Sequence, residues 1–421
     1  MRAGYKMGFD LLRYSPQGDK QNSAFFETYR HKIFERRVSL GLDQLLAKLR
    51  ALVVHVETGD GLPYLGELAL MTPYRMIGSY ISASHKIFVL GSQPHYPRLI
   101  VMEPLSASYE DDIKQLNMIY PLARRKPNAR YIGEIFQTAN LKSTQELLES
   151  CNISFHYPGD CQNGFYTSDA MRFTLPSDFT HNRVGYSELS LEDPDELQLG
   201  QPFQLTNSQS KALDEQAELG KQLGIGHLIE GVDHMATRVL AGEREDAILE
   251  FLTLSNYYFW GAYNIEEMNS STNVTRHPEV NDDKHSPAKV FTANNTPSFV
   301  NSFEKLPMPT EDFVRNFGRR MHHIAYEVSD GDHSSEQKNV DFVVEQLRNH
   351  KIPFLAHVIG ECKDQPDLKQ IFSKHSEYSV LITEYVERCH GFSGFFTREN
   401  VASLTAAAGQ DERYDHGHVF D

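Results

Sequence analysis

The sequence contains few cysteines: Cys151, Cys161, Cys362 and Cys389, with no CxxC pair among them. Cysteines so few and so scattered exclude a disulfide framework as the basis of the fold. No uninterrupted run of 18 apolar residues occurs, and the N-terminus lacks the apolar segment of a signal peptide. We therefore expect a soluble, cytoplasmic protein that does not enter a membrane.

Positive charge is also scarce. The 41 lysines and arginines stand against 57 aspartates and glutamates, which gives a formal net charge of −16 over 421 residues. A surface this acidic argues against nucleic acid or an anionic membrane as the main partner. The 40% of hydrophobic residues is ordinary for a globular protein and provides enough apolar material for two domains, while the oligomeric state stays open.

A weak internal repeat organises the chain. Segments that begin near residues 131, 233 and 323 each read as strand, loop, amphipathic helix and strand, and a less clear copy lies at residues 49–70. A polar, acidic stretch at residues 190–222 reads as a connection, which predicts an N-terminal domain at 1–215 and a C-terminal domain at 216–421. Similar patterns also recur by chance in mixed proteins, so the repeat alone leaves this division open.

Two histidines occupy the same position in two copies of the repeat, His234 in VDHMA and His323 in HHIA. Equivalent positions in paired modules would place these side chains next to each other. Strand alternation would send the neighbouring His322 to the opposite face of the sheet. The first copy has Glu134 but no histidine at the corresponding place, which predicts that the first half is a degenerate, metal-free structural domain.

A third candidate ligand is Glu384, which stands inside an otherwise apolar strand. A carboxylate is costly to bury there unless it faces a cation. The alternative is an edge strand with Glu384 in water or paired with Arg388. Two histidines and one carboxylate would leave about three open positions on an octahedral ion, which suits non-haem Fe(II).

At these residues the sequence resembles the 4-hydroxyphenylpyruvate dioxygenase family of the vicinal oxygen chelate superfamily. The resemblance covers about residues 225–405. The similar segments are Val232–His234, Tyr258–Trp260, Val290–Asn294, His323–Ala325, Leu368–Lys374, Glu384–Arg388 and Gly391–Leu404.

The resemblance implies an α+β, two-domain fold of repeated βαβββ modules that form open barrels, with a catalytic, iron-binding second half that ends in a gating helix. It implies Fe(II) as the cofactor, held by His234, His323 and Glu384. It also implies a dioxygenase that uses O₂ to decarboxylate an aromatic or hydrophobic 2-oxo acid and to oxidise the same molecule. Alternatives are mandelate-type hydroxylation, extradiol ring cleavage, or a metal-free binding protein of this fold.

Further site residues are carried over from the family. Gln370 and Phe372 share one strand face and would orient and stack on the substrate, and Phe392 would close the pocket, although ordinary core packing is the alternative for both aromatic rings. The remaining substrate-binding candidates are Ala288, Asn294 and Asn400.

The sequence also departs from the family pattern. Ala288 and Phe303 stand where the family has polar residues, and His322 stands where it has Gln. Because a buried phenol hydroxyl would lose partners, these changes predict a less polar substrate than 4-hydroxyphenylpyruvate. A polar stretch at residues 264–286 reads as a surface loop.

Overall fold

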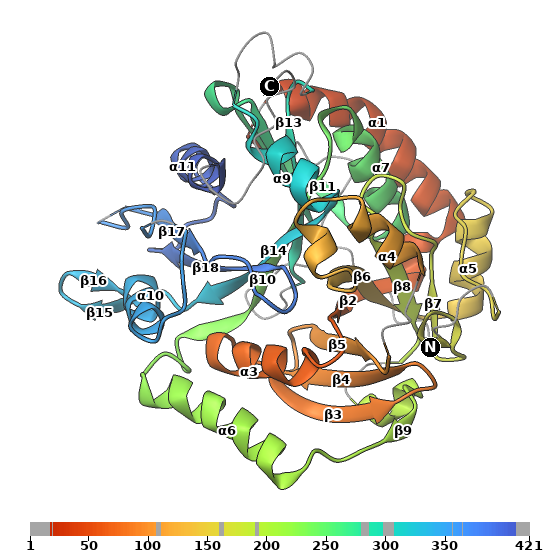
Figure 1. Ribbon diagram of the computed structural model, residues 1–421. Helices are drawn as coiled ribbons and strands as arrows, with labels where there is room; N and C mark the ends of the chain where they lie inside the picture. Colours follow the sequence, from red (N-terminus) through yellow and green to blue (C-terminus); the bar gives the residue numbers. More distant parts are fainter. Residues whose placement is uncertain are drawn as a thin grey trace, which may run out of the picture.

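The computed structural model describes residues 17–18, 20–106, 111–159, 164–189, 193–278, 286–297, 307–355, 357–363 and 365–409. Two curved, eight-stranded mixed sheets stand back to back, with helices over their outer sides and ends (Figure 1). This arrangement is the α+β fold of two open barrels that the sequence predicts. No helix among the described residues has the length and apolar character needed to cross a membrane.

The first sheet has the strand order β7-β8-β6-β2-β5-β4-β3-β9. Its strands are β2 (Leu46–His55), β3 (Arg75–Ile81), β4 (His85–Gly91), β5 (Arg98–Pro104), β6 (Arg130–Thr138), β7 (Met171–Phe173), β8 (Arg183–Ser187) and β9 (Gln201–Pro202). The helices of this half are α2 (Leu42–Leu45), α3 (Gly61–Met71), α4 (Asp111–Met118) and α5 (Leu141–Glu149).

The second sheet has the order β1-β11-β12-β13-β10-β14-β18-β17. Its strands are β1 (Gln17–Gly18), β10 (Ile229–Arg238), β11 (Tyr258–Ile265), β12 (Ser270–Arg276), β13 (Ala288–Asn294), β14 (Arg320–Val328), β17 (Asp367–Phe372) and β18 (Ile382–Cys389). Its helices are α7 (Arg244–Leu254), α9 (Pro309–Phe317), α10 (Asn339–Asn349) and α11 (Arg398–Gly409), and β15 (Asp332–Ser334) with β16 (Gln337–Lys338) forms a separate hairpin.

Strand pairing shows that the two halves repeat one topology. β2 pairs parallel with β5 and antiparallel with β6, and β10 pairs in the same ways with β13 and β14. β6 and β14 in turn pair parallel with β8 and β18. The repeat therefore includes the unclear copy at residues 49–70, which forms β2 and α3.

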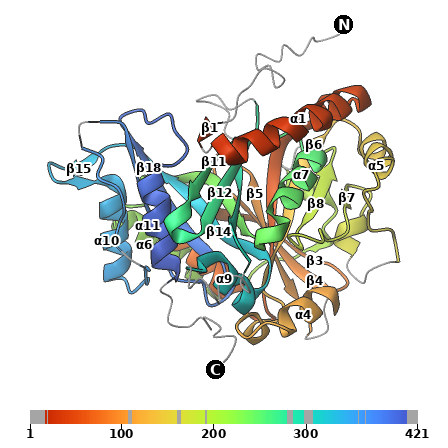
Figure 2. The ribbon, with the colours of Figure 1, turned by 90° about the horizontal axis from the view of Figure 1, so that it is seen from above.

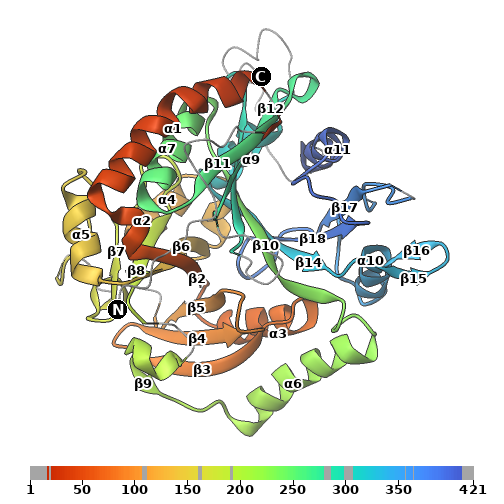
Figure 3. The ribbon, with the colours of Figure 1, turned by 180° about the vertical axis from the view of Figure 1, so that it is seen from behind.

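The stretch at residues 190–222 is more than a connection, because it contains α6 (Asn207–Gln222). Thr206 caps this helix in a reciprocal capping box with Gln209. The helix lies along α3 at one end of the molecule (Figure 3). Because α6 spans residue 215, the domain boundary expected there falls within a helix. The polar composition of the stretch is the reason why it read as a connection.

Helix α1 (Lys20–Leu40) belongs spatially to the second sheet, although it comes first in the chain (Figure 2). The ring of Phe26 stacks on that of Phe259 with centroids 4.1 Å apart. Arg37, which is buried, donates to the backbone carbonyl oxygens of Leu252 and Tyr257. The N-terminal helix therefore packs against the second half of the chain.

The loop predicted at residues 264–286 is wrong for its first part, which forms the end of β11 and the whole of β12. Polar residues are accommodated there because the sheet satisfies them: Thr275 donates to the carbonyl of Lys289, and Asn273 to that of Phe291. Residues 279–285, at the end of the expected loop, lie outside the described residues.

A disulfide joins Cys362 to Cys389, with Cα atoms 5.7 Å apart. It ties the end of β18 to the segment that precedes β17, so it lies at the ends of two neighbouring strands. No sequence motif indicates this pair, since the two cysteines are 27 positions apart.

Candidate metal centre

Three neighbouring strands of the second sheet bring His234, His323 and Glu384 together. They lie on β10, β14 and β18, and all three side chains are buried. The two Nε2 atoms are 3.2 Å apart, and Oε2 of Glu384 lies 3.1 Å from Nε2 of His234 and 3.0 Å from Nε2 of His323. The structure thus assembles all three residues that the sequence proposes as metal ligands.

The cluster fits a bound cation better than a set of internal hydrogen bonds. Glu384 is 1% exposed; its Oε1 has no hydrogen-bond partner, and its Oε2 meets only the two histidine Nε2 atoms. A buried carboxylate in that state is costly unless a cation meets it. Two imidazole nitrogens and one carboxylate on one side of an ion form the donor set of non-haem Fe(II) sites, so these residues fit that metal.

Burial and the neighbouring charges together set the pKa values of the three cluster residues. Burial raises the pKa of Glu384, but His323 and His234 outweigh it and hold this pKa below its usual value. Burial lowers the pKa of His234, but Glu384 and Asp233 more than offset it and raise the value to about 9. For His323, burial prevails and lowers the pKa.

A second layer of residues orients the first histidine. Nδ1 of His234 donates to Oδ1 of Asp233 at 2.6 Å, and both guanidinium nitrogens of Arg388 pair with the same carboxylate. Burial raises the pKa of Asp233, but Arg388 and His234 lower it further, so Asp233 stays ionised. Arg388 therefore pairs with Asp233 and not with Glu384, and a carboxylate behind a ligating histidine fixes its ring orientation.

The expected position of His322 is wrong, because β14 is not regular there. Ala236 of β10 pairs with His323, but the next residue, Thr237, pairs with Met321, so His322 is the extra residue of a β-bulge. The bulge turns His322 toward the same side as His323, and their Nδ1 atoms lie 2.8 Å apart. Burial, followed by Arg238, lowers the pKa of His322 well below its usual value.

Two members of the cluster, His323 and Glu384, line a cavity. Gln370 faces this cavity with neither amide atom hydrogen-bonded, and the ring of Phe372 lies 4.8 Å from that of His323. Both residues therefore stand where the sequence expects them. The other lining residues are Ala236, Arg238, Thr272, Val290, Thr292, His322, Phe396, Val401, Leu404 and Thr405.

Ala288 and Phe392 do not line this cavity. Ala288 is buried beside the metal cluster as the β13 partner of His234, and Phe392 is half-buried against the neighbouring core. Ala288 therefore removes no polar partner from the cavity, and Phe303 lies outside the described residues. The expectation of a less polar substrate therefore stays a prediction.

The two asparagines proposed to bind substrate are engaged in the scaffold. Asn294 donates to the carbonyl of Asn269 and accepts the N–H of Glu311. Asn400 donates to the carbonyl of Leu368, which fastens α11 to β17. Neither is among the residues that line the cavity, so a role in substrate binding stays a prediction for both.

Two aromatic residues that the sequence did not single out stand beside the cluster. The ring centroids of Phe395 and Phe396 lie 5.5 and 5.2 Å from that of His234. They directly precede α11, which contributes Val401, Leu404 and Thr405 to the cavity wall. The sequence feature that could have identified them is the pair of adjacent phenylalanines that begins three residues after Phe392.

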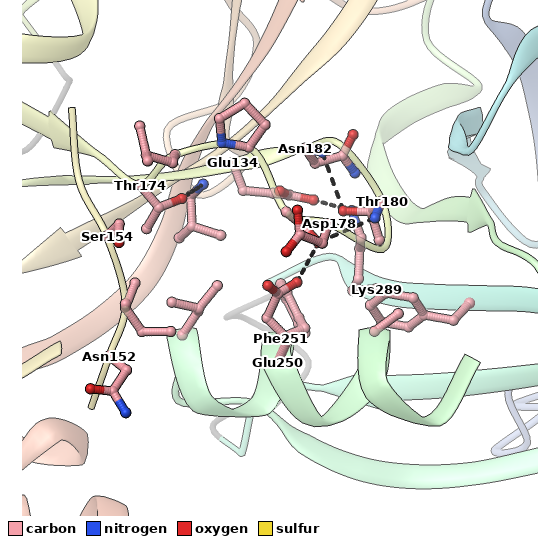
Figure 4. A pocket seen from close by; sticks show the side chains of 18 residues that line it. Glu134, Asn152, Ser154, Thr174, Asp178, Thr180, Asn182, Glu250, Phe251 and Lys289 are labelled. Carbon is pink, nitrogen blue, oxygen red and sulfur yellow. Dashed lines mark hydrogen bonds and ion pairs between the residues drawn. The ribbon is translucent and has the colours of Figure 1, made fainter. Parts of the chain in front are cut away.

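A second, larger cavity lies between β6, β8 and α7, away from the metal cluster (Figure 4). A buried ion pair between Glu134 and Lys289 borders it and joins the two halves. Burial lowers the pKa of Lys289, although Glu134 acts in the opposite direction. Glu134, whose register counterpart in the second half is Ile324, thus makes a contact between the two halves.

No family model and no curated protein matches this chain. Among solved structures it resembles a triple mutant of 4-hydroxymandelate synthase from Streptomyces coelicolor, at 13% identity over 86% of this chain and 99% of that one, with a TM-score of 0.57. A fusion of a xylose isomerase-like TIM barrel with 4-hydroxyphenylpyruvate dioxygenase matches at 12% identity over 93% of this chain and 58% of that one, with a TM-score of 0.54.

A halotolerant catechol dioxygenase matches at 12% identity over 83% of this chain and 90% of that one, with a TM-score of 0.42. The first two likenesses, together with the repeated strand pairing, show that the chain has the vicinal oxygen chelate fold. Identities this low establish the fold, and the activity has to be argued from the site.

Proposed function

We propose that this protein is a non-haem Fe(II)-dependent dioxygenase that decarboxylates a 2-oxo acid and oxidises the same molecule. The observation that carries the proposal is the buried cluster of His234, His323 and Glu384, two of whose members line a cavity. Its partners would be the 2-oxo acid and dioxygen. The likeness to structures titled 4-hydroxymandelate synthase and 4-hydroxyphenylpyruvate dioxygenase supports this reaction class.

The three ligands would hold the metal from one side only, because they come from adjacent strands of one curved sheet. Bound Fe(II) would supply a coordination sphere open to a chelating 2-oxo acid and the redox chemistry that dioxygen requires. Asp233 would keep the Nδ1 proton on His234, so that Nε2 is free to bind the metal. Phe395 and Phe396 would keep water from this side of the centre.

Gln370 and Phe372 would position the substrate. The amide of Gln370 is buried without a partner and faces the cavity, so a polar group of the ligand would satisfy it. Phe372 presents its ring between His323 and the cavity, where it would stack on an aromatic tail. These contacts favour an aromatic 2-oxo acid over a small aliphatic one.

The test is an anaerobic titration of the Fe(II)-loaded protein with a panel of 2-oxo acids, followed by admission of oxygen. A bidentate 2-oxo acid on Fe(II) gives a visible absorption band, and the true substrate should also trigger oxygen uptake and release of CO₂. Glu384→Ala should abolish iron, band and uptake, whereas His95→Ala, in the first half, should change none of them. A metal-free binding protein would take up no stoichiometric iron.

Product analysis separates the possible outcomes for the same site. Oxidation of an aromatic ring and hydroxylation of the side chain to a mandelate-type acid give products of different chromatographic behaviour. Because the chain resembles structures with both kinds of title, the fold does not choose between them.

A further inference from the structure

The larger cavity, between β6, β8 and α7, has no part in the proposed function (Figure 4). Both halves of the chain contribute to it: β6, β8 and the loop between β7 and β8 come from the first half, and α7 and β13 come from the second. It shares no lining residue with the cavity beside Glu384. A ligand bound here would therefore contact both halves without touching the candidate metal centre.

Asn182 supplies this cavity with an acceptor that has no partner. The residue lines the cavity and is 6% exposed, and its Oδ1 is buried without a hydrogen bond. The orientation of the amide follows from Thr237, whose hydroxyl donates to Sδ of Met321 and therefore accepts from Nδ2 of Asn182. A buried amide oxygen without a donor is costly, so a ligand that donates would satisfy it.

Two carboxylates reach the cavity from opposite sides, Asp178 from the loop between β7 and β8 and Glu250 from α7 (Figure 4). Ser177 donates a hydrogen bond to Glu250. Among the described residues that line the cavity, Lys289 is the only basic one, and it is already paired with Glu134. Burial raises the pKa of Glu250 against the effect of Ser177, and Asp178 raises it further. The cavity therefore has an excess of negative charge that a cationic ligand would offset.

The rest of the wall selects the kind of cation. Ca²⁺ takes six to eight oxygen ligands and usually several carboxylates, whereas much of this cavity is apolar. A primary ammonium group carries three donors, which suits two carboxylates and one amide oxygen. An organic amine also brings an apolar part for the remaining wall, which consists of Ile153, Leu175, Val184, Phe251, Leu254 and Phe291.

We propose that this cavity binds a small organic amine, with its ammonium group held by Glu250, Asp178 and Oδ1 of Asn182 and its apolar part against Phe251 and Phe291. The site is additional to the proposed function and does not depend on it, because the two cavities share no residue. Binding should stabilise the folded protein, since the ligand would contact both halves.

The first test compares three probes of similar shape by calorimetric titration: 2-phenylethylamine, the neutral 2-phenylethanol and the anionic 3-phenylpropanoate. The amine should bind at least about tenfold more tightly than the alcohol, because its hydrogen bonds to the carboxylates are charge-assisted. The anion should not bind measurably. The affinity for the amine should be the same in the iron-loaded and the metal-free protein.

The second test uses variants of the wall. Glu250→Gln keeps the shape and removes the charge, so the affinity for the amine should fall about 10- to 150-fold. Asn182→Leu removes the acceptor, and the affinity should fall about 2- to 10-fold. The matched control is Asp246→Asn, on the same helix, because Asp246 is exposed and does not line the cavity; it should leave the affinity unchanged. Thermal melting shows whether each variant is folded.

Equal binding of the amine and the alcohol, or no binding of the amine, would overturn the proposal, and this outcome needs no variant. An affinity for the amine that is unchanged in folded Glu250→Gln, or that requires iron, would place the amine elsewhere. Calcium that displaces the amine from the wild type would identify a metal site instead. Iron uptake and the absorption band with 2-oxo acids test the proposed function separately, so the two failures are distinguishable.

Discussion

The two halves of the chain build the same curved sheet around different interiors. When the two sheets are compared by strand register, His234 corresponds to Ala51, His323 to Gly133 and Glu384 to Gly185. On the same strands, Gln370 corresponds to Met171 and Phe372 to Phe173. The same backbone therefore surrounds a polar cluster in the second half and an apolar core in the first half. A small number of inward-facing side chains accounts for this difference.

The glycines of the first half explain how its interior is filled. A Cβ atom at Gly185 would lie 2.5 Å from the ring of Phe173, and one at Gly133 would lie 1.8 Å from the backbone oxygen of Arg183. Phe173 therefore occupies the space that corresponds to the carboxylate of Glu384. Phe173 is fully buried, whereas its counterpart Phe372 faces a cavity.

The largest effect that we expect is loss of the metal. Alanine at His234, His323 or Glu384 should remove most bound iron and activity, because two ligands cannot hold Fe(II) in competition with water. Metal analysis after anaerobic purification measures this, with circular dichroism to show that each variant is folded.

The matched control lies in the first half. Simultaneous substitution of His85, His95 and His156 should leave the iron content unchanged, since the ligand positions of that half are Ala51, Gly133 and Gly185. Loss of iron from a folded control would show that the first half contributes a ligand. Full iron in His323→Ala would transfer the role to His322.

The second prediction compares two phenylalanines at equivalent positions: alanine in place of one should mainly lower stability, and alanine in place of the other should mainly weaken ligand binding. Phe173→Ala should lower the free energy of unfolding by about 3–5 kcal/mol, because it opens a void in a closed core. Phe372→Ala should cost clearly less stability, because its ring already borders a cavity, but should weaken 2-oxo acid binding about tenfold. Urea unfolding and the anaerobic titration measure the two quantities. Equal stability losses would contradict the difference between the two interiors.

The sequence was sufficient to predict which residues the structure brings together as a candidate metal site. His234 and His323 stand at the same place in two copies of a repeat, and a charged Glu384 in an apolar strand is costly without a partner. These are local patterns, and the topology turns them into a cluster.

What the sequence could not show depends on pairing between distant segments. The bulge at His322 exists only relative to β10, so strand alternation gave the wrong face. The partner of Glu134 is Lys289, 155 residues away, and nothing local to either residue indicates the other. By contrast, the helix α6 was readable from its capping box at Thr206 and Gln209, although its polar composition drew attention away from it.

The third prediction concerns Asp233, whose register counterpart in the first half is Arg50. Arg50 pairs with Gln137 there, whereas Asp233 accepts a hydrogen bond from His234, a candidate ligand. Asp233→Asn should lower Fe(II) affinity about 10- to 100-fold with little loss of fold, because the amide supports His234 less firmly. Arg50→Gln should leave that affinity unchanged. Competition with a calibrated chelator measures both, and equal values for Asp233→Asn and the wild type would refute the positioning role.

The smallest effect that we expect is the pH dependence of metal binding. It also distinguishes the two halves, because His234 has a raised pKa and its register counterpart in the first half, Ala51, does not titrate. Burial lowers the pKa of His234, but Glu384 and Asp233 raise it to about 9, so the metal-free ring is protonated at neutral pH. A metal needs the neutral ring, so binding must displace one proton, and affinity should rise about tenfold per pH unit up to about pH 9 and then level off. Calorimetric titration in buffers of different ionisation enthalpy counts the released proton. In Asp233→Asn the plateau should begin at lower pH, because one of the two carboxylates that hold the proton is gone. Proton release that is zero at pH 7 would contradict the assignment of His234 as the ligand that titrates.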